Sequence, residues 1–142
     1  MRRPAAALVL VDTGPLVAIL DDQDGHHQAC VHALVALEGP LYTCWPVITE
    51  AAWLLRHSPG AVRRLLDSIN TSFVELLSLE GPDVPPIAAI LEKYKTIRPQ
   101  LADATLVYLA ERERIETIFT LDRKDFSIYR TSRGRSFRIL PH

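Results

Sequence analysis

The sequence predicts an α/β fold of three layers, with helices covering both faces of a central, mostly parallel sheet of four or five strands. The 142 residues, 48% hydrophobic and 23% charged, fit one globular domain spanning residues 1–142. Short apolar runs alternate with longer helical stretches, as in successive βαβ crossovers. The chain contains no internal repeat, low-complexity tract or linker that would divide it.

The predicted strands are short apolar runs bounded by turn signals or by the start of a helix. The first is closed by the turn residues 12–15, in which Pro15 also suits the first position of a helix. An edge strand is expected near the C-terminus, in residues 137–140. The four strands before it are predicted at residues 6–11, 41–45, 73–77 and 116–121.

The predicted helices begin at prolines or after Gly/Pro breaks. Pro46 opens one helix, Pro85 and Pro86 introduce another, and Pro99 separates the last two. The expected helices are residues 15–20, 26–37, 46–56, 61–69, 87–97 and 102–114.

Cysteine use and hydropathy indicate a reduced, cytoplasmic protein. Cys30 and Cys44 are too few for a disulfide framework or a zinc site, and we expect both to be buried. The longest apolar run, residues 5–11, is far shorter than the roughly 20 residues of a membrane span. Trp45 and Trp53, at a strand end and on an apolar helix, are expected in the core.

The charge is unevenly distributed along the chain. The net charge of −1 combines +5 in residues 123–142 with −6 in the remainder. Such asymmetry hints at a polyanionic partner, although a basic terminal stretch is more often solvated surface.

Two acids follow predicted strands directly. Asp12 comes after the first strand and Asp122 after the fourth. Ligands of open parallel sheets bind beyond the carboxyl ends of the strands. Both acids therefore fall on the expected ligand edge.

Two further acids lie on apolar helix faces. Glu50 has Val47 and Leu54 as helical neighbours, and Asp103 has Leu106 and Val107. Each acid, taken singly, has an ordinary explanation as a helix cap or a turn residue. Apart from Asp122, which Arg123 and Lys124 follow, none has a lysine or arginine within one helical turn. Four such carboxylates gathered at one sheet edge would need a cation, and hard oxygen ligands select Mg²⁺ or Mn²⁺. Such ions activate water and offset charge that develops on a phosphodiester.

These motifs resemble those of the PIN-domain ribonucleases, in the small single-domain form of VapC-type toxins. The resemblance covers nearly the full chain and rests on residues 11–18, 47–51, 102–104 and 119–126. It implies a PIN-like α/β/α fold and a Mg²⁺-dependent endoribonuclease in which Mn²⁺ substitutes. The acids that it assigns to catalysis and metal binding are Asp12, Glu50, Asp103 and Asp122.

The resemblance also implies supporting residues and partners. Asp125 is an auxiliary acid, and whether it or Asp122 is the fourth ligand stays open, as does the number of metal ions. Thr13 and Thr120 match positions where the family often has a hydroxyl. The substrate is RNA, and family members commonly form homodimers and, as toxins, bind a small antitoxin. The basic residues expected to contact RNA are Arg123, Lys124, Arg130 and Arg133.

Two alternatives remain at this stage. One is a catalytically silent PIN-like module that binds RNA or protein. The other is a metal-dependent phosphoryl-transfer domain of the receiver or haloacid-dehalogenase type, which also places aspartates at strand ends. A haloacid-dehalogenase motif would need an aspartate two residues after Asp12, where Gly14 stands.

Overall fold

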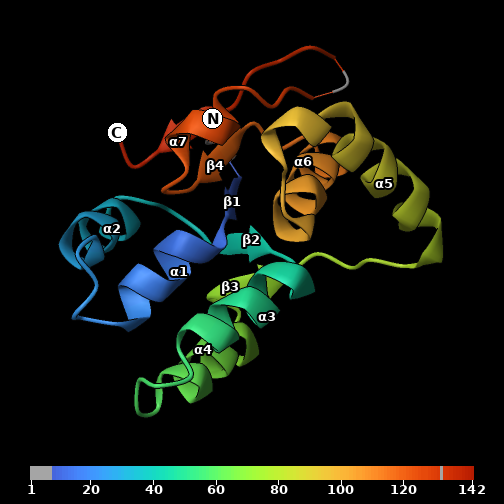
Figure 1. The fold of residues 1–142 in the computed structure, drawn as a ribbon. Coiled ribbons are helices and arrows are strands. Elements are labelled where there is room, and N and C mark those ends of the chain that lie inside the picture. Colours follow the sequence, from blue (N-terminus) through green and yellow to red (C-terminus); the bar gives the residue numbers. More distant parts are fainter. Residues whose placement is uncertain (1–7, 132) are drawn as a thin grey trace, which may run out of the picture.

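The computed structural model describes residues 8–131 and 133–142, and its centre is a five-stranded sheet enclosed by helices (Figure 1). The strand order is β3-β2-β1-β4-β5, and all neighbouring strands are parallel. The predicted three-layer α/β/α fold is confirmed, with a sheet that is wholly parallel. The strands are β1 (Val9–Val11), β2 (Leu41–Thr43), β3 (Val74–Leu76), β4 (Thr117–Phe119) and β5 (Arg138–Leu140).

The sheet is built around β1, which pairs with β2 on one side and β4 on the other. Its three residues are buried, and Val11 is aligned with Phe119 of β4. Parallel pairing therefore brings the carboxyl ends of β1 and β4 to the same point of the sheet edge. Residues 6 and 7 of the first predicted strand lie outside the described residues.

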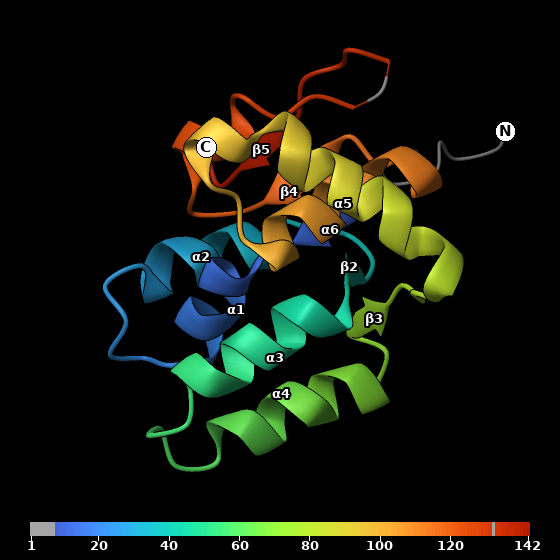
Figure 2. The same cartoon turned by 45° about the vertical axis from the view of Figure 1, so that its right-hand side comes forward.

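The helices pack as neighbouring pairs around the sheet (Figure 2). Helix α1 contacts α2, α3 and α4, α5 packs along α6, and α3 also contacts α6. They are α1 (Thr13–Leu20), α2 (His27–Val35), α3 (Trp45–Leu54), α4 (Ala61–Asn70), α5 (Val84–Lys93), α6 (Leu101–Glu113) and α7 (Arg123–Phe126), with 3₁₀ turns η1 (Gly81–Asp83) and η2 (Lys95–Ile97).

Most element boundaries shift by one to four residues from the sequence prediction, and the differences that matter most concern α3, α5 and α7. Trp45 begins α3 instead of ending β2, and α5 stops at Lys93 before a separate 3₁₀ turn. The short helix α7 was not predicted, because four residues are too few to show a helical period. It is fixed locally, since the Asp122 side chain accepts the Asp125 N–H at 3.1 Å.

The tryptophan prediction is wrong. Trp45 and Trp53 are 56% and 63% exposed, because α3 turns Val47, Ile48 and Ala51 to the core instead. The Trp53 ring lies under the Arg56 guanidinium, 3.8 Å from its centroid. Cys30 and Cys44 are free and buried, as predicted.

The aromatic part of the core comes from the C-terminal third of the chain. Tyr129 is fully buried, and its ring meets Tyr94 and Phe126 edge to face, each at 5.0 Å between centroids.

Within the described residues, no helix is long and apolar enough to cross a membrane.

Candidate functional site

A cleft of about 500 Å³ opens at the carboxyl ends of β1 and β4, and five carboxylates line it. We call it the acid cleft. The strand ends meet there because the Asp12 N–H donates to the Phe119 carbonyl at 2.9 Å. Its lining residues are Asp12, Thr13, Gly14, Glu50, Leu54, Arg98, Gln100, Asp103, Leu121, Asp122 and Asp125.

Asp12 is held at both carboxylate oxygens. Oδ1 accepts the Thr13 N–H at 2.8 Å, which makes Asp12 the N-cap of α1. Oδ2 accepts the Thr120 hydroxyl at 2.8 Å. Thr120 Oγ1 in turn accepts the Asp122 N–H at 3.0 Å, so one hydroxyl links the acids that follow β1 and β4.

Asp122 and Asp125 lie together at the start of α7. Asp122 uses Oδ1 to cap that helix, and both side chains line the acid cleft. The charge of Asp122 raises the pKa of Asp12, and it raises the pKa of Asp103 more than Asp125 does. Asp122 is therefore the acid more strongly coupled to the others.

Gln100 connects Asp103 to Glu50. Its backbone N–H donates to Asp103 Oδ2 at 3.0 Å, as half of a capping box at the start of α6. In the amide orientation that pairs donors with acceptors, Gln100 Nε2 lies 3.2 and 3.0 Å from the two oxygens of Glu50. Two acids from different helices are thus positioned by one amide residue.

Three acids of the cleft, Asp12, Glu50 and Asp103, have raised pKa values. Burial, followed by the charge of Asp12, raises the pKa of Asp103 to about 6. Burial also raises the pKa of Asp12, with further contributions from Glu50 and Asp122 that its two hydrogen bonds oppose. The pKa of Glu50 is raised by burial and then by Asp103. The cluster therefore holds more negative charge than its surroundings compensate.

Protein cations do not neutralise this charge. Among the described residues, no lysine or arginine forms an ion pair with any of the five acids. Nor do three His, Cys, Asp or Glu side chains in that part of the chain stand close enough to share one ion. Like-charged carboxylates are expected to stand apart in this way until a cation draws them together.

Two buried hydroxyls beside the acids also lack a hydrogen-bond partner in the part of the chain that the structure describes. They are Thr13 Oγ1 and Tyr129 OH. Thr13 Oγ1 makes no hydrogen bond of normal geometry, yet it lies close enough to Glu50 to lower the pKa of that carboxyl. Burial, followed by the charges of Asp103 and Asp125, raises the pKa of Tyr129. Unpartnered buried polar atoms are uncommon and call for an explanation such as a water or an ion. Uncompensated carboxylates with orphaned hydroxyls fit a hard divalent cation and its water shell.

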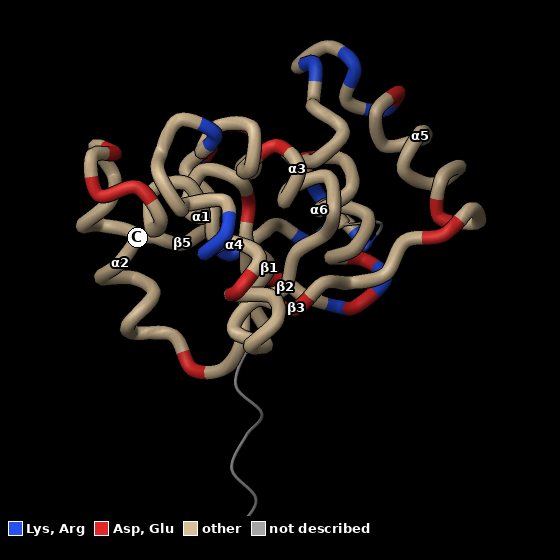
Figure 3. The backbone as a smooth tube through the Cα atoms, turned by 90° about the horizontal axis from the view of Figure 1, so that it is seen from below, with Lys and Arg blue, Asp and Glu red and all other residues tan. Residues whose placement is uncertain are grey.

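The predicted basic residues lie outside the acid cleft. The Arg123 guanidinium donates to the Pro141 carbonyl at 2.6 Å, and that of Arg130 donates to the Ser127 and Tyr129 carbonyls. Neither they nor Lys124 and Arg133 belong to the lining of the cleft. The basic positions that the structure describes are spread over separate segments of the backbone (Figure 3). Their contact with RNA stays a prediction.

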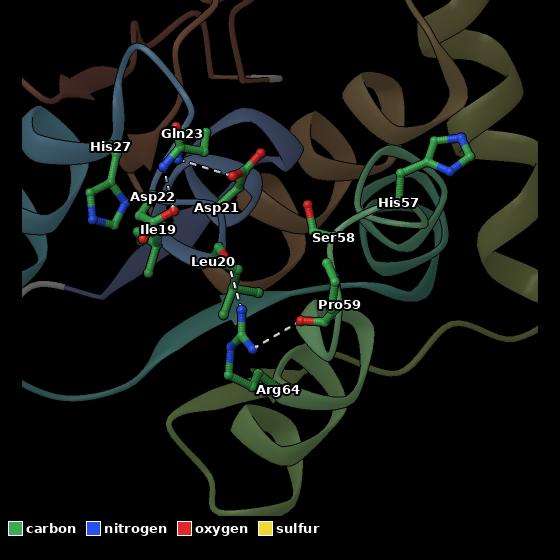
Figure 4. Close-up of a pocket in the computed structure, with 10 residues that line it drawn as sticks. All are labelled: Ile19, Leu20, Asp21, Asp22, Gln23, His27, His57, Ser58, Pro59 and Arg64. Carbon is green, nitrogen blue, oxygen red and sulfur yellow. Dashed lines mark hydrogen bonds between the residues drawn. The ribbon is translucent and has the colours of Figure 1, made fainter.

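A second cleft, of about 590 Å³, lies between the α1–α2 loop and the α3–α4 loop (Figure 4). We call it the loop cleft. Asp21 and Asp22 bond to the backbone N–H and side-chain amide of Gln23, respectively, and Arg64 donates to the Leu20 and Pro59 carbonyls. These charged side chains are thus already hydrogen-bonded within the cleft. Its residues are Ile19, Leu20, Asp21, Asp22, Gln23, His27, His57, Ser58, Pro59 and Arg64.

Sequence reasoning identified every acid of the cleft but missed three other residues. Arg98 and Gln100 line the cleft, and Tyr129 is buried beside it. The capping-box spacing from Gln100 to Asp103 was a readable signal for one of them. Nothing local marks Arg98 or Tyr129, since their relation to the acids depends on tertiary packing.

The fold and the acids at the β1–β4 edge define the class of protein. A model of the PIN domain matches residues 9–132. The chain belongs to the PIN-domain family.

Its relatives are VapC proteins. The chain is 30% identical to Ribonuclease VapC26 of Mycobacterium tuberculosis over 135 residues, which cover 94% of this chain and 100% of the relative. Its fold is similar to the crystal structure of VapC20 of the same organism, a sarcin–ricin loop cleaving toxin. The TM-score is 0.71 at 16% identity, with 78% of this chain and 86% of the other covered. Within the PIN-domain family, the chain is of the small VapC-like type.

Proposed function

We propose that this protein is a Mg²⁺-dependent endoribonuclease, the toxin of a type II toxin–antitoxin pair, with residues 1–142 as one nuclease domain. The observation that carries the proposal is the acid cleft, in which five carboxylates from four separate segments converge without an ion-pair partner among residues 8–131 and 133–142. The similarity to Ribonuclease VapC26 over nearly the whole chain supports RNA as the substrate.

Each acid has a distinct part in this proposal. Asp12, fixed at both oxygens by Thr13 and Thr120, would be the central ligand and retains further lone pairs for a cation. Asp103 and Asp122 each use one oxygen to cap a helix and keep the other for the cleft. Glu50, held by Gln100, would complete the set, and Asp125 would assist Asp122.

A divalent cation bound there, Mg²⁺ or in its place Mn²⁺, would supply Lewis-acid chemistry to a water nucleophile and a scissile phosphodiester. The protein's own part is orientation. Thr120 fixes the separation of the Asp12 and Asp122 segments, and the capping box fixes Asp103 relative to Glu50. Pre-positioned carboxylates avoid the reorganisation that free side chains would need.

We also propose two kinds of protein partner, a small antitoxin and a second copy of the chain. Their support is the membership in the VapC-like type.

The decisive experiment is cleavage of defined tRNA and rRNA fragments by the purified full chain in Mg²⁺ or Mn²⁺. Asp12→Asn should lower the cleavage rate by on the order of 100-fold or more, and EDTA should abolish it. Asp22→Asn, in the loop cleft, is the matched control and should cleave within about two-fold of wild type, since surface changes rarely matter.

Full activity of folded Asp12→Asn, or cleavage that persists in EDTA, would overturn the proposal. Salt-dependent RNA binding without turnover would instead identify the silent binding module. A phosphatase screen with EDTA controls separates the phosphoryl-transfer alternative.

A further inference from the structure

Arg98 stands apart from the other arginines because it lines the acid cleft. Arg98 is the one positively charged residue among the described residues that line this cleft. It is exposed, and its guanidinium forms no hydrogen bond or ion pair with any described residue. A free cation therefore stands at the rim of a cleft whose carboxylates carry uncompensated charge.

The backbone at Arg98 is fixed while its side chain is free. The Arg98 N–H donates to the Lys95 carbonyl at 3.2 Å, and Pro99 follows with its restricted φ. One residue further, Gln100 is tied to Asp103 and Glu50. The Cα of Arg98 is thus held at a set place relative to two acids of the cleft.

The conformation of Arg98 adds a second observation. Its φ of 52° and ψ of 60° lie in the left-handed region, which glycine adopts without cost and other residues disfavour. An arginine here has a backbone cost that glycine would avoid. Arg114 shares this conformation outside the cleft, so the backbone supports a role for Arg98 only together with its place in the cleft lining. Residues in sparsely populated conformations gather at functional sites.

The chemistry of the guanidinium selects the ligand. Its planar fork of donors matches a phosphate group, and it stays charged at any physiological pH. An anion entering this cleft meets five carboxylates, so a positive group at the rim would offset that repulsion at the point of entry. The C-terminal arginines Arg123 and Arg130 use their guanidinium groups on carbonyls of their own segment.

We propose that Arg98 binds a backbone phosphate of the RNA and positions the strand over the acid cleft. This inference rests on the proposed function and adds a substrate-binding residue to it. The competing role is that Arg98 only balances the charge of the carboxylates. That role would change the affinity for a metal ion and leave RNA binding unaltered.

The chain offers a close control in Arg114. This arginine is also exposed and left-handed, with φ of 56° and ψ of 44°, but it ends α6, whereas Arg98 precedes its start. It is not part of the acid cleft. Replacing either arginine by alanine removes the same charge from the same kind of backbone.

Binding of a fluorescein-labelled oligouridylate to the full chain, in an Asp12→Asn background that prevents cleavage, tests the proposal. Arg98→Ala should weaken binding by about tenfold and reduce the slope of log Kd against log salt by about one, as loss of one phosphate contact does. Arg98→Lys should recover part of the affinity, because it keeps the charge and loses the fork. Arg114→Ala should stay within about two-fold of its parent.

Calorimetric titration of Mn²⁺ into Arg98→Ala, with Asp12 intact, separates the two roles. An unchanged Mn²⁺ affinity together with the weakened RNA binding is the expected result. Changed Mn²⁺ affinity with normal RNA binding overturns the proposal, as does equal loss of RNA binding in Arg98→Ala and Arg114→Ala.

The failures of the two proposals are distinguishable. If the chain cleaves RNA in an Asp12-dependent way and Arg98→Ala binds RNA normally, only the proposal for Arg98 is overturned and the nuclease proposal stands. Failure of the parent chain to bind the oligouridylate at low salt, together with absence of cleavage, would overturn both.

Discussion

The acid cleft and the loop cleft differ less in size than in the number of their acids and in where those acids come from. The loop cleft is the larger, at about 590 Å³ against 500 Å³, and Asp21 and Asp22 are adjacent in one loop. The acids of the acid cleft come from four segments spread over more than a hundred residues. Convergence of like charges from distant segments is costly to fold, so it indicates a functional demand more reliably than cavity size does.

The two clefts also differ in how their acids are satisfied. In the loop cleft, Gln23 bonds to both aspartates. In the acid cleft, helix caps occupy one oxygen each of Asp103 and Asp122, and burial raises the pKa of Asp103. Asp103 and Asp122 thus each cap a helix and also line the acid cleft. From the sequence, capping and membership of a site are alternative explanations of the same acid.

The largest effect that would sharpen this comparison concerns metal affinity. Glu50→Gln should weaken Mn²⁺ binding by about 100-fold, because it removes one negative charge and a ligand from a set that is already positioned. Asp22→Asn should leave the affinity unchanged. Isothermal titration of both variants measures this, and a greater loss in Asp22→Asn would place the metal in the loop cleft.

A smaller effect concerns the two glutamines that hold acids. Gln100→Leu should weaken Mn²⁺ binding by about tenfold, since loss of a residue that orients a ligand typically has that effect. Gln23→Leu is its counterpart, because Gln23 Nε2 holds Asp22 at 3.1 Å in the loop cleft. Titration of the pair should show a loss for Gln100→Leu only; equal affinities would mean that Gln100 does not orient Glu50.

The smallest effect concerns stability in metal-free buffer. The Asp103 pKa of about 6 exceeds an unfolded value of about 3.9, so the folded state binds the proton more tightly. Its ionisation therefore destabilises the fold increasingly from about pH 4 to 6, and fully above that. Asp103→Asn should raise the free energy of unfolding by about 1 kcal/mol at pH 7, a value discounted for solvent screening.

Urea unfolding in EDTA at pH 7 and near pH 4 measures this difference. The gain from Asp103→Asn should shrink to a small fraction near pH 4, where the aspartate is almost fully protonated in the folded protein and about half protonated in the unfolded chain. Asp21→Asn should change stability by less than about 0.5 kcal/mol at either pH. A gain of equal size at both pH values would show that ionisation of Asp103 is not its cause.

Much of the fold was predictable because its signals are local. The prolines at positions 15 and 46 mark helix starts within two residues of those observed. The apolar runs around Val11 and Phe119 mark the two strands that carry the site. The prediction failed for Trp45 and Trp53, whose exposure depends on which face α3 turns to the sheet.

The sequence by itself determined the order of the elements, the acids that follow β1 and β4, and the caps that hold them, because these depend on residues within a few positions. Tertiary structure alone decided the partners across the cleft. The strand order brings Thr120 to Asp12 across 108 positions, and the entry into α6 brings Gln100 to Glu50. Tertiary structure also brings the Arg123 guanidinium to the Pro141 carbonyl and places Arg98 in the lining of the acid cleft. The physical reason is that hydrogen bonds and charges act over a few ångströms of space, and parallel strand pairing sets which distant residues share that space.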